Sequence, residues 1–279
     1  MAGDNRPAVW HIAFDGRKVG SVRIRSAGGT DVGRVREQNE DSYLVDDDHR
    51  LYVVADGMGG HLGGHVASSL AVATVAEKVL AGFGAMEGAR DSALDESPVS
   101  GLLADTVRSA CGAIYERAQH DPELQGMGTT VTAMIVVGNS GFVAHVGDSR
   151  CYLLRGDRIV QITDDHSLVN EQLKAGLITR EQARASQLKN IITRSVGFER
   201  DVAVDTFALQ LAPGDCFLLC SDGLANVVDD GEIGRALTDI DLGNVPQALI
   251  NLANSRGGED NITVVCLAVD GDTAAPPGG

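Results

Sequence analysis

Three aspartates stand where an apolar segment begins or ends, and carboxylates in that position can hold a metal ion. Asp56 follows LYVVA, Asp222 follows DCFLLCS, and Asp260 precedes NITVVCLAV. Glycine follows two of them, and an Asp-Gly pair is by itself an ordinary turn signal. The same context at three places is harder to assign to turns alone.

A fourth acidic element, Glu40-Asp41, precedes the apolar segment SYLV. If Ser42–Ala55 folds as a hairpin around the acidic loop Asp46–Asp48, this element returns beside Asp56. Carboxylates gathered without matching Lys or Arg repel and raise each other's pKa unless a divalent cation lies among them. Oxygen ligands favour Mg²⁺ or Mn²⁺, and no His/Cys set has zinc spacing. The pattern therefore predicts a metal centre.

The elements that must position these carboxylates are short strands and a few helices. β-Branched or alternating segments recur, and turn pairs such as Asn139–Gly141 and Gly156-Asp157 indicate antiparallel hairpins. Helical patterns cover His65–Leu80, Val99–Ala118, Ser167–Ala185 (two short helices) and Pro246–Ser255. The order of elements predicts one α+β domain with layered sheets.

Composition excludes several classes of protein. The chain has 279 residues and a net charge of −16 with 23 Lys plus Arg, which argues against a nucleic-acid binder. Its five cysteines lie mostly in apolar segments, so we expect reduced thiols and a cytoplasmic protein. We expect no membrane span, and a disordered tail over residues 271–279.

Seven motifs occur in order: TDVGRVREQNEDS, VVADGMGGH, GMGTTVTA, AHVGDSRCYLL, QITDDHSLV, LLCSDGL and EDNITVV. Together they resemble the metal-dependent protein phosphatase (protein phosphatase 2C) family in its bacterial form, from about residue 25 to 270. The resemblance implies a β-sandwich of two antiparallel sheets flanked by helix pairs. It also implies a protein-serine/threonine phosphatase, in which a water activated by two metal ions attacks phosphorus directly.

The resemblance also implies residue roles. Asp56 would bridge two Mg²⁺ or Mn²⁺ ions, with the carbonyl of Gly57 on one ion. The other ion would be held by Asp222 and Asp260. Glu40 and Asp41 would act through metal-bound waters.

Two further side chains match family positions. Arg36 would hold the phosphate, since a guanidinium fork suits two phosphate oxygens. Asp148, in GDSR, would hold a weaker third ion. Asn226 stands where relatives often carry an aspartate, which weakens that third site because an amide is a poorer ligand for a hard dication.

The residue after Asp56-Gly57 is Met58, where many eukaryotic relatives have a histidine thought to protonate the leaving alkoxide. A thioether cannot donate a proton. We expect a metal-bound water, or else His61, to act as the acid. We expect the glycines that follow Asp56 to clear space for ions and phosphate.

Segment 164–195 corresponds to the family's variable flap, and we expect it to carry substrate choice. Residues 1–24, which contain AVWHIAFDGRKVG, look like an added hairpin arm of the same domain. The expected partners are phosphoproteins and a cognate bacterial Ser/Thr kinase, and the expected state is a monomer.

Three alternatives remain open at this point. Cys111–Arg117 fits the Cys-x5-Arg spacing of tyrosine phosphatases, but it lies inside a helical pattern, where Cys111 would be a packing residue. A pseudophosphatase would bind phosphoproteins without turnover, although such a protein is expected to lose its carboxylates. A different two-metal phosphoesterase would act on nucleotides.

Overall fold

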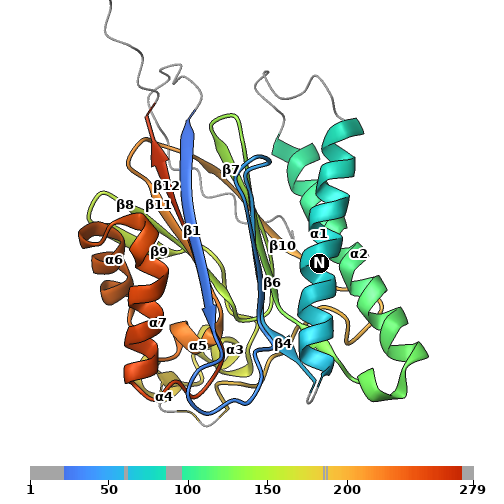
Figure 1. Ribbon diagram of the computed structural model, residues 1–279. Coiled ribbons are helices and arrows are strands. Elements are labelled where there is room, and N and C mark those ends of the chain that lie inside the picture. The colour runs from blue at the N-terminus through green and yellow to red at the C-terminus, as the bar shows by residue number, and fades with distance from the viewer. Residues whose placement is uncertain (1–21, 60–61, 86–95, 185, 187, 272–279) are drawn as a thin grey trace, which may run out of the picture.

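The computed structural model describes residues 22–59, 62–85, 96–184, 186 and 188–271. The expected N-terminal arm up to residue 21, His61, and the tail from residue 272 lie outside these ranges. The described residues form two β-sheets packed face to face, with helices on both outer faces (Figure 1).

Each sheet has five strands, and the pairs within each sheet are antiparallel. The first sheet has the order β1 (Arg23–Asp31), β12 (Ile262–Asp270), β11 (Cys216–Cys220), β8 (Arg150–Arg155) and β9 (Arg158–Gln161). The second has the order β10 (Asp205–Gln210), β7 (Ser140–Val146), β6 (Val131–Val137), β3 (Leu51–Ala55) and β2 (Ser42–Asp46). A short pair, β4 (Gly57–Met58) and β5 (Gly128–Thr129), extends one end of the second sheet. The predicted sandwich is confirmed.

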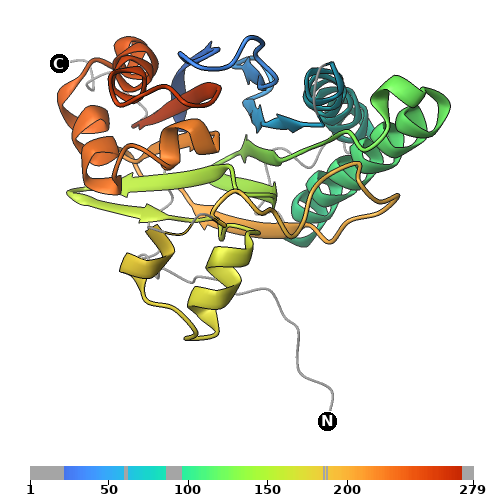
Figure 2. The ribbon, with the colours of Figure 1, turned by 90° about the horizontal axis from the view of Figure 1, so that it is seen from below.

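The helices separate by face. Helices α1 (Gly63–Ala85) and α2 (Glu96–His120) pack on the second sheet. Helices α5 (Asp222–Ala225), α6 (Asp230–Asp239) and α7 (Val245–Ser255) pack on the first. Two short helices, α3 (Leu168–Lys174) and α4 (Arg180–Arg184), stand off the sandwich (Figure 2). Single-turn 3₁₀ helices cover Pro122–Leu124 and Leu242–Asn244.

Strand β3 shows why both faces of a sheet must be apolar here. Tyr52 and Val54 pack between the two sheets, whereas Leu51, Val53 and Ala55 pack under α1 and α2. Because successive side chains of a strand point to opposite faces, a strand covered on both faces is apolar throughout. All five residues of β3 are fully buried.

Helix α1 has the length and composition of a membrane span over Gly63–Phe83, contrary to the expectation from the sequence. Its inner face nevertheless belongs to the core with the second sheet, through Ala67, Ala71, Val75 and Val79. A core helix meets the same criterion of length and composition, and one face of α1 packs as such a helix does, with 33% of the apolar window buried.

The predicted hairpin forms with the expected register. Ser42 pairs with Ala55 and Asp46 with Leu51, so β2 and β3 close around the acidic loop. The register returns Asp41 to the end of β3 beside Asp56. Sequence pattern alone thus placed two of the candidate ligands together.

The predicted helices are also present, each with slightly different ends. Thr179 and Gln182 form the expected capping box: each backbone N–H donates to the other side chain, at 2.8 and 3.3 Å. Helices α5 and α6 were not predicted. The signal for α6 was a second capping box, between Asp229 and Glu232.

Candidate metal centre

The candidate carboxylates meet at one end of the sandwich. A cavity of about 900 Å³ there is lined by side chains that include Glu40, Asp56, Asp148, Asp222 and Asp260. In Figure 1 this is the lower end, where β4 and α5 lie. The ends of antiparallel strands from both sheets therefore deliver acidic groups to one place.

Asp56 ends β3 and is held through its backbone. Its N–H donates to Oγ1 of Thr130 (2.9 Å), and its carbonyl accepts from Oγ1 of Thr129 (2.8 Å) and from N–H of Thr130 (2.9 Å). Desolvation, and then the nearby charge of Asp41, raises the pKa of Asp56 well above its usual range. The largest contributions all disfavour the charged form of this carboxylate.

Asp41 links the two sheets through one oxygen. Its Oδ2 accepts from Oγ of Ser221 (2.8 Å) and Oγ1 of Thr263 (2.6 Å), which belong to the first sheet's side of the sandwich. Its Oδ1 is buried without a hydrogen-bond partner in the described structure. Burial raises the pKa of Asp41 to about 7.

Asp148 lies between β7 and β8 and is buried in a similar way. Only 7% of the residue is exposed, and its Oδ1 is buried without a hydrogen-bond partner in the part of the chain described. Burial, and then the charge of Asp222, raises the pKa of Asp148 to about 8. A bound cation would supply what this oxygen lacks.

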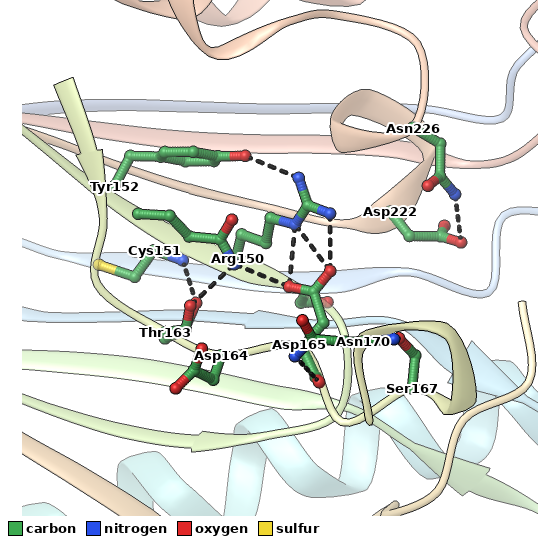
Figure 3. Close-up of polar contacts among 12 residues, drawn as sticks. Arg150, Cys151, Tyr152, Thr163, Asp164, Asp165, Ser167, Asn170, Asp222 and Asn226 are labelled. Carbon is green, nitrogen blue, oxygen red and sulfur yellow. Dashed lines mark hydrogen bonds and ion pairs between the residues drawn. The ribbon is translucent and has the colours of Figure 1, made fainter. Parts of the chain in front are cut away.

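Asp222 begins α5, and Asn226 donates to its Oδ2 from Nδ2 at 3.0 Å (Figure 3). Burial, and then the charge of Asp260, raises the pKa of Asp222 to about 6. Asn226, the departure from the family pattern, is therefore in direct contact with a candidate ligand.

Arg36 reaches the site from the loop before β2. Its guanidinium forms an ion pair with Oδ2 of Asp260 at 2.8 Å, and its side chain is 51% exposed. Asn261 holds this loop: its Nδ2 donates to the carbonyls of Val32 (2.9 Å) and Gln38 (3.0 Å). Asn261 was not singled out in the sequence, although it belongs to the EDNITVV motif.

Glu40 is placed by its backbone. Its N–H donates to Oδ1 of Asn261 (2.8 Å), and its carbonyl accepts from Oγ of Ser68 on α1 (2.5 Å). Its side chain lines the cavity. Glu40 thus connects Asn261, which precedes strand β12 of the first sheet, to helix α1, which packs on the second sheet.

The glycines after Asp56 pack closely against other parts of the protein. A Cβ on Gly57 would lie 2.1 Å from the carbonyl oxygen of Gly64 and 2.5 Å from that of Glu40. Gly59, with φ +140°, would meet Met127 at 2.8 Å. Both glycines also line the cavity, and that they clear space there for ions and phosphate stays a prediction.

The donor set fits a hard dication. Several carboxylates surround the cavity, and two buried carboxylate oxygens have no partner among the described residues. Burial, and then the charges of neighbouring carboxylates, raise the pKa values of Asp41 and Asp148. As the side chains stand, no three His, Cys, Asp or Glu of the described residues already form an ion-binding group. The carboxylates line the cavity without closing on one point.

The candidates for proton transfer are placed differently. Met58 lines the cavity, where its thioether cannot donate a proton. His65 is exposed on α1. The Cys-x5-Arg match lies inside α2, and Cys111 is fully buried there, with its pKa raised by desolvation. The tyrosine-phosphatase alternative therefore lacks the phosphate-binding loop that it requires.

Sequence reasoning missed a partly buried ion pair beside the site. Arg150 of GDSR binds both carboxylate oxygens of Asp165, at 2.6–3.1 Å, and donates to the hydroxyl of Tyr152 at 3.0 Å (Figure 3). Asn170 of α3 donates to the carbonyl of Asp165 at 2.7 Å. This pair attaches the start of segment 164–195 to β8, two residues from Asp148.

A buried histidine pair lies under the same segment. His145 of β7 and His166 have ring centroids 4.8 Å apart, and Nε2 of His166 lies 3.2 Å from Asp205. Burial lowers the pKa of His145 to about 3, so this ring is neutral. The sequence signals were two of the quoted motifs, AHVGDSRCYLL with His145 and QITDDHSLV with His166.

Comparison with known proteins gives a consistent result. A family model described as protein phosphatase 2C matches residues 29–244. The serine/threonine phosphatase stp of Listeria innocua is 40% identical over 242 residues, which is 85% of this chain and 93% of that protein.

Solved structures agree with these sequence matches. The Mycobacterium tuberculosis serine/threonine phosphatase PstP/Ppp has a TM-score of 0.79 at 36% identity, covering 89% of this chain and 99% of that one. The catalytic domain of a PstP phosphatase in complex with 2 manganese ions has a TM-score of 0.74 at 35% identity, covering 90% and 100%.

Proposed function

Because the chain belongs to the protein phosphatase 2C family and is a protein serine/threonine phosphatase, we propose that it cleaves phosphoserine and phosphothreonine in proteins by direct attack of water on phosphorus. No nucleophilic side chain is required. The observation that carries the proposal is the convergence of Asp56, Asp222 and Asp260 on one cavity beside Arg36.

The residues proposed to hold two Mn²⁺ or Mg²⁺ ions are Asp56, Asp222, Asp260 and the carbonyl of Gly57. The manganese ions bound to the PstP relative support this choice of metal. When bound, such a pair lowers the pKa of water and neutralises charge on a phosphoryl group. Glu40 and Asp41 are proposed to act through waters, and Asp148 in a weaker third site.

Arg36 is the proposed phosphate-binding residue. In the structure its guanidinium pairs with Asp260, so it lies within reach of the carboxylate cluster. A guanidinium offers two parallel N–H donors to phosphate, which fixes the orientation of the group as well as its charge. Its proposed role is to hold the phosphoryl oxygens in line for attack.

The proton that the leaving alkoxide needs must come from a group other than Met58. We propose that a water of the centre supplies it, with His61 as the alternative. A His61→Ala variant that loses about a thousandfold in rate would favour the histidine, because general acids contribute roughly that much.

The decisive experiment is hydrolysis of a phosphothreonine peptide. Turnover is expected to require Mn²⁺ and to be abolished in Asp222→Ala. Asp239→Ala, at the exposed end of α6, is the matched control and should retain activity. Full activity of Asp222→Ala would overturn the metal assignment. Absence of turnover in the unaltered protein would favour a pseudophosphatase, and release of phosphate from nucleotides alone would favour the third alternative.

The finer assignments belong to the same proposal. We infer a catalytic domain over residues 25–270 that acts as a cytoplasmic monomer and opposes a bacterial Ser/Thr kinase. Segment 164–195 is proposed to influence substrate choice, and its residues Asn190, Ile192 and Thr193 line the cavity. Equal phosphothreonine levels in the wild-type strain and in a strain that lacks this protein would count against the cellular role.

A further inference from the structure

The cavity extends well beyond the carboxylates. Its volume of about 900 Å³ is in the range that takes a drug-sized ligand, which is far more than one phosphoryl group fills. Part of its wall is made by a loop that follows segment 164–195. We refer to residues 196–203 as the wall loop; it contributes Phe198, Glu199, Asp201, Val202 and Ala203 to the cavity.

The wall loop is fixed to helix α2. Sγ of Cys111 donates to the carbonyl of Glu199 (3.1 Å) and accepts from N–H of Gly197 (3.3 Å). Gly197 has φ +99°, and a Cβ there would lie 2.1 Å from Ile114 of α2. The two hydrogen bonds hold the loop against the helix, and the absence of a side chain at Gly197 allows the close approach.

Both ends of the wall loop are also tied down. Val196 is fully buried and exchanges two backbone hydrogen bonds with Thr129 (2.8 and 3.0 Å), the residue whose hydroxyl binds the carbonyl of Asp56. Arg194 donates to the carbonyl of Ala203 (3.2 Å) and to Asp205 (2.6 Å). The loop is therefore connected to the candidate metal centre through a continuous set of hydrogen bonds.

Phe198 stands at the tip of this fixed loop with 67% of its surface exposed. The adjoining cavity residues Glu199 and Asp201 are acidic and exposed, while Ile192 and Val202 add apolar surface. An exposed aromatic ring on a fixed backbone beside the cavity can bind an apolar side chain without the cost of ordering the loop. The neighbouring carboxylates repel an acidic one.

We propose that the wall loop is a substrate subsite, in which Phe198 contacts an apolar side chain of the phosphoprotein next to the phosphorylated residue. Glu199 and Asp201 select against acidic residues at that position. The inference rests on the proposed function. A substrate whose phosphate lies at Asp56 and Asp222 must place the residues beside its phosphorylated residue in the same cavity, so the substrate itself is the proposed occupant of the subsite.

The test compares phosphothreonine peptides that differ at one residue flanking the phosphothreonine, on either side: Leu, Gly or Glu. On one of the two flanks, we expect kcat/KM for the Leu peptide to exceed that for the Gly peptide about tenfold, which is a typical effect of an apolar contact in a pocket. The Glu peptide should be the poorest. Phe198→Ala should reduce the Leu/Gly ratio to about 1.

A matched control and a second pair of variants make the result interpretable. Val160→Ala, on the exposed face of β9 and absent from the cavity lining, should keep the Leu/Gly ratio. Cys111→Ser retains a donor for the carbonyl of Glu199 and should preserve the ratio, whereas Cys111→Ala should lower it.

Failure of the subsite and failure of the phosphatase proposal give different results. If neither the peptides nor p-nitrophenyl phosphate is hydrolysed with Mn²⁺, the proposed function itself is wrong. If they are hydrolysed but the wild-type Leu/Gly ratio is near 1 for both flanks, or survives in Phe198→Ala, the subsite is wrong.

Discussion

Asn226 donates from its Nδ2 to the Oδ2 atom of Asp222 at 3.0 Å, so a neutral side chain stands next to a carboxylate that already faces the charge of Asp260. Asp222 also contributes to the raised pKa of Asp148, the proposed third-site ligand. The amide thus relieves negative charge in the metal-free protein while offering a weak ligand to a third ion.

Replacing Asn226 tests both effects of its amide, on the metal-free protein and on the third ion. Asn226→Asp is expected to tighten the weakest Mn²⁺-binding step by about tenfold, since a carboxylate is a better ligand for a hard dication. It should also lower metal-free stability by roughly 1–2 kcal/mol, because the hydrogen bond becomes a repulsion. Calorimetric titration counts the binding steps, and an unchanged weakest step would contradict the third-site assignment.

The stability of the metal-free protein should fall as pH rises. Burial raises the pKa of Asp41 to about 7 and of Asp148 to about 8, above the unfolded value of about 3.9. A group with a raised folded pKa stabilises the fold at low pH, and this contribution is lost as pH rises through the folded pKa. With a chelator present, Tm should therefore decrease from pH 6.5 to 8.5.

Two comparisons check the origin of this effect. Saturating Mg²⁺ should flatten the decrease, because an ion favours the charged carboxylates, and Asp148→Asn should reduce it without any metal. The range above pH 6.5 avoids the opposite contribution of buried His145, whose lowered pKa destabilises the fold only in acid. A Tm that rises with pH in chelator would contradict the prediction.

Arg36 should matter more for its shape than for its charge alone. Arg36→Ala is expected to lower kcat/KM about a hundredfold, the usual loss when one preorganised electrostatic contact is removed. Arg36→Lys keeps the charge but not the fork, so a loss of about tenfold is expected. Steady-state kinetics with Arg108→Ala as the control, an exposed arginine of α2, measures both. Equal activity of the Lys and Arg forms would argue against bidentate binding.

Gly57 should tolerate no side chain. Gly57→Ala places a methyl group against two backbone oxygens that have no room to yield, and we expect a loss of about 3 kcal/mol in unfolding free energy. Gly101→Ala is the control: nothing lies within 4 Å of its Cβ, and α2 should gain up to about 1 kcal/mol. Denaturant unfolding of both variants measures whether each substitution lowers or raises the unfolding free energy.

The features that sequence predicted are those set by local patterns. The β2–β3 hairpin follows from two apolar segments joined by a short acidic turn, so the pairing of Ser42 with Ala55 could be predicted, and with it the meeting of Asp41 and Asp56. The Thr179–Gln182 box is a contact over three residues and is equally visible. The carboxylate cluster could be inferred as a metal site because like charges gathered at strand ends repel one another unless a cation lies among them.

The features that were missed depend on contacts between distant segments. Cys111 holds the loop at Gly197 and Glu199, more than 80 residues away, and no pattern in either segment announces the other. The close contacts of Gly57 with Glu40 and of Gly59 with Met127 were missed as well, because these neighbours are also remote in sequence. Tertiary packing decided both, and it has no periodicity to detect.

Asp41 joins the two sheets through hydroxyls of Ser221 and Thr263, and Oγ of Ser221 also accepts from the backbone N–H of Thr263 at 2.9 Å. Opening at this end of the sandwich must break these bonds together. In hydrogen–deuterium exchange, the amides of Thr263 and of the β3 end should therefore lose protection in a single cooperative event. The carboxylate cluster would then keep its geometry for as long as the two sheets stay joined at this end.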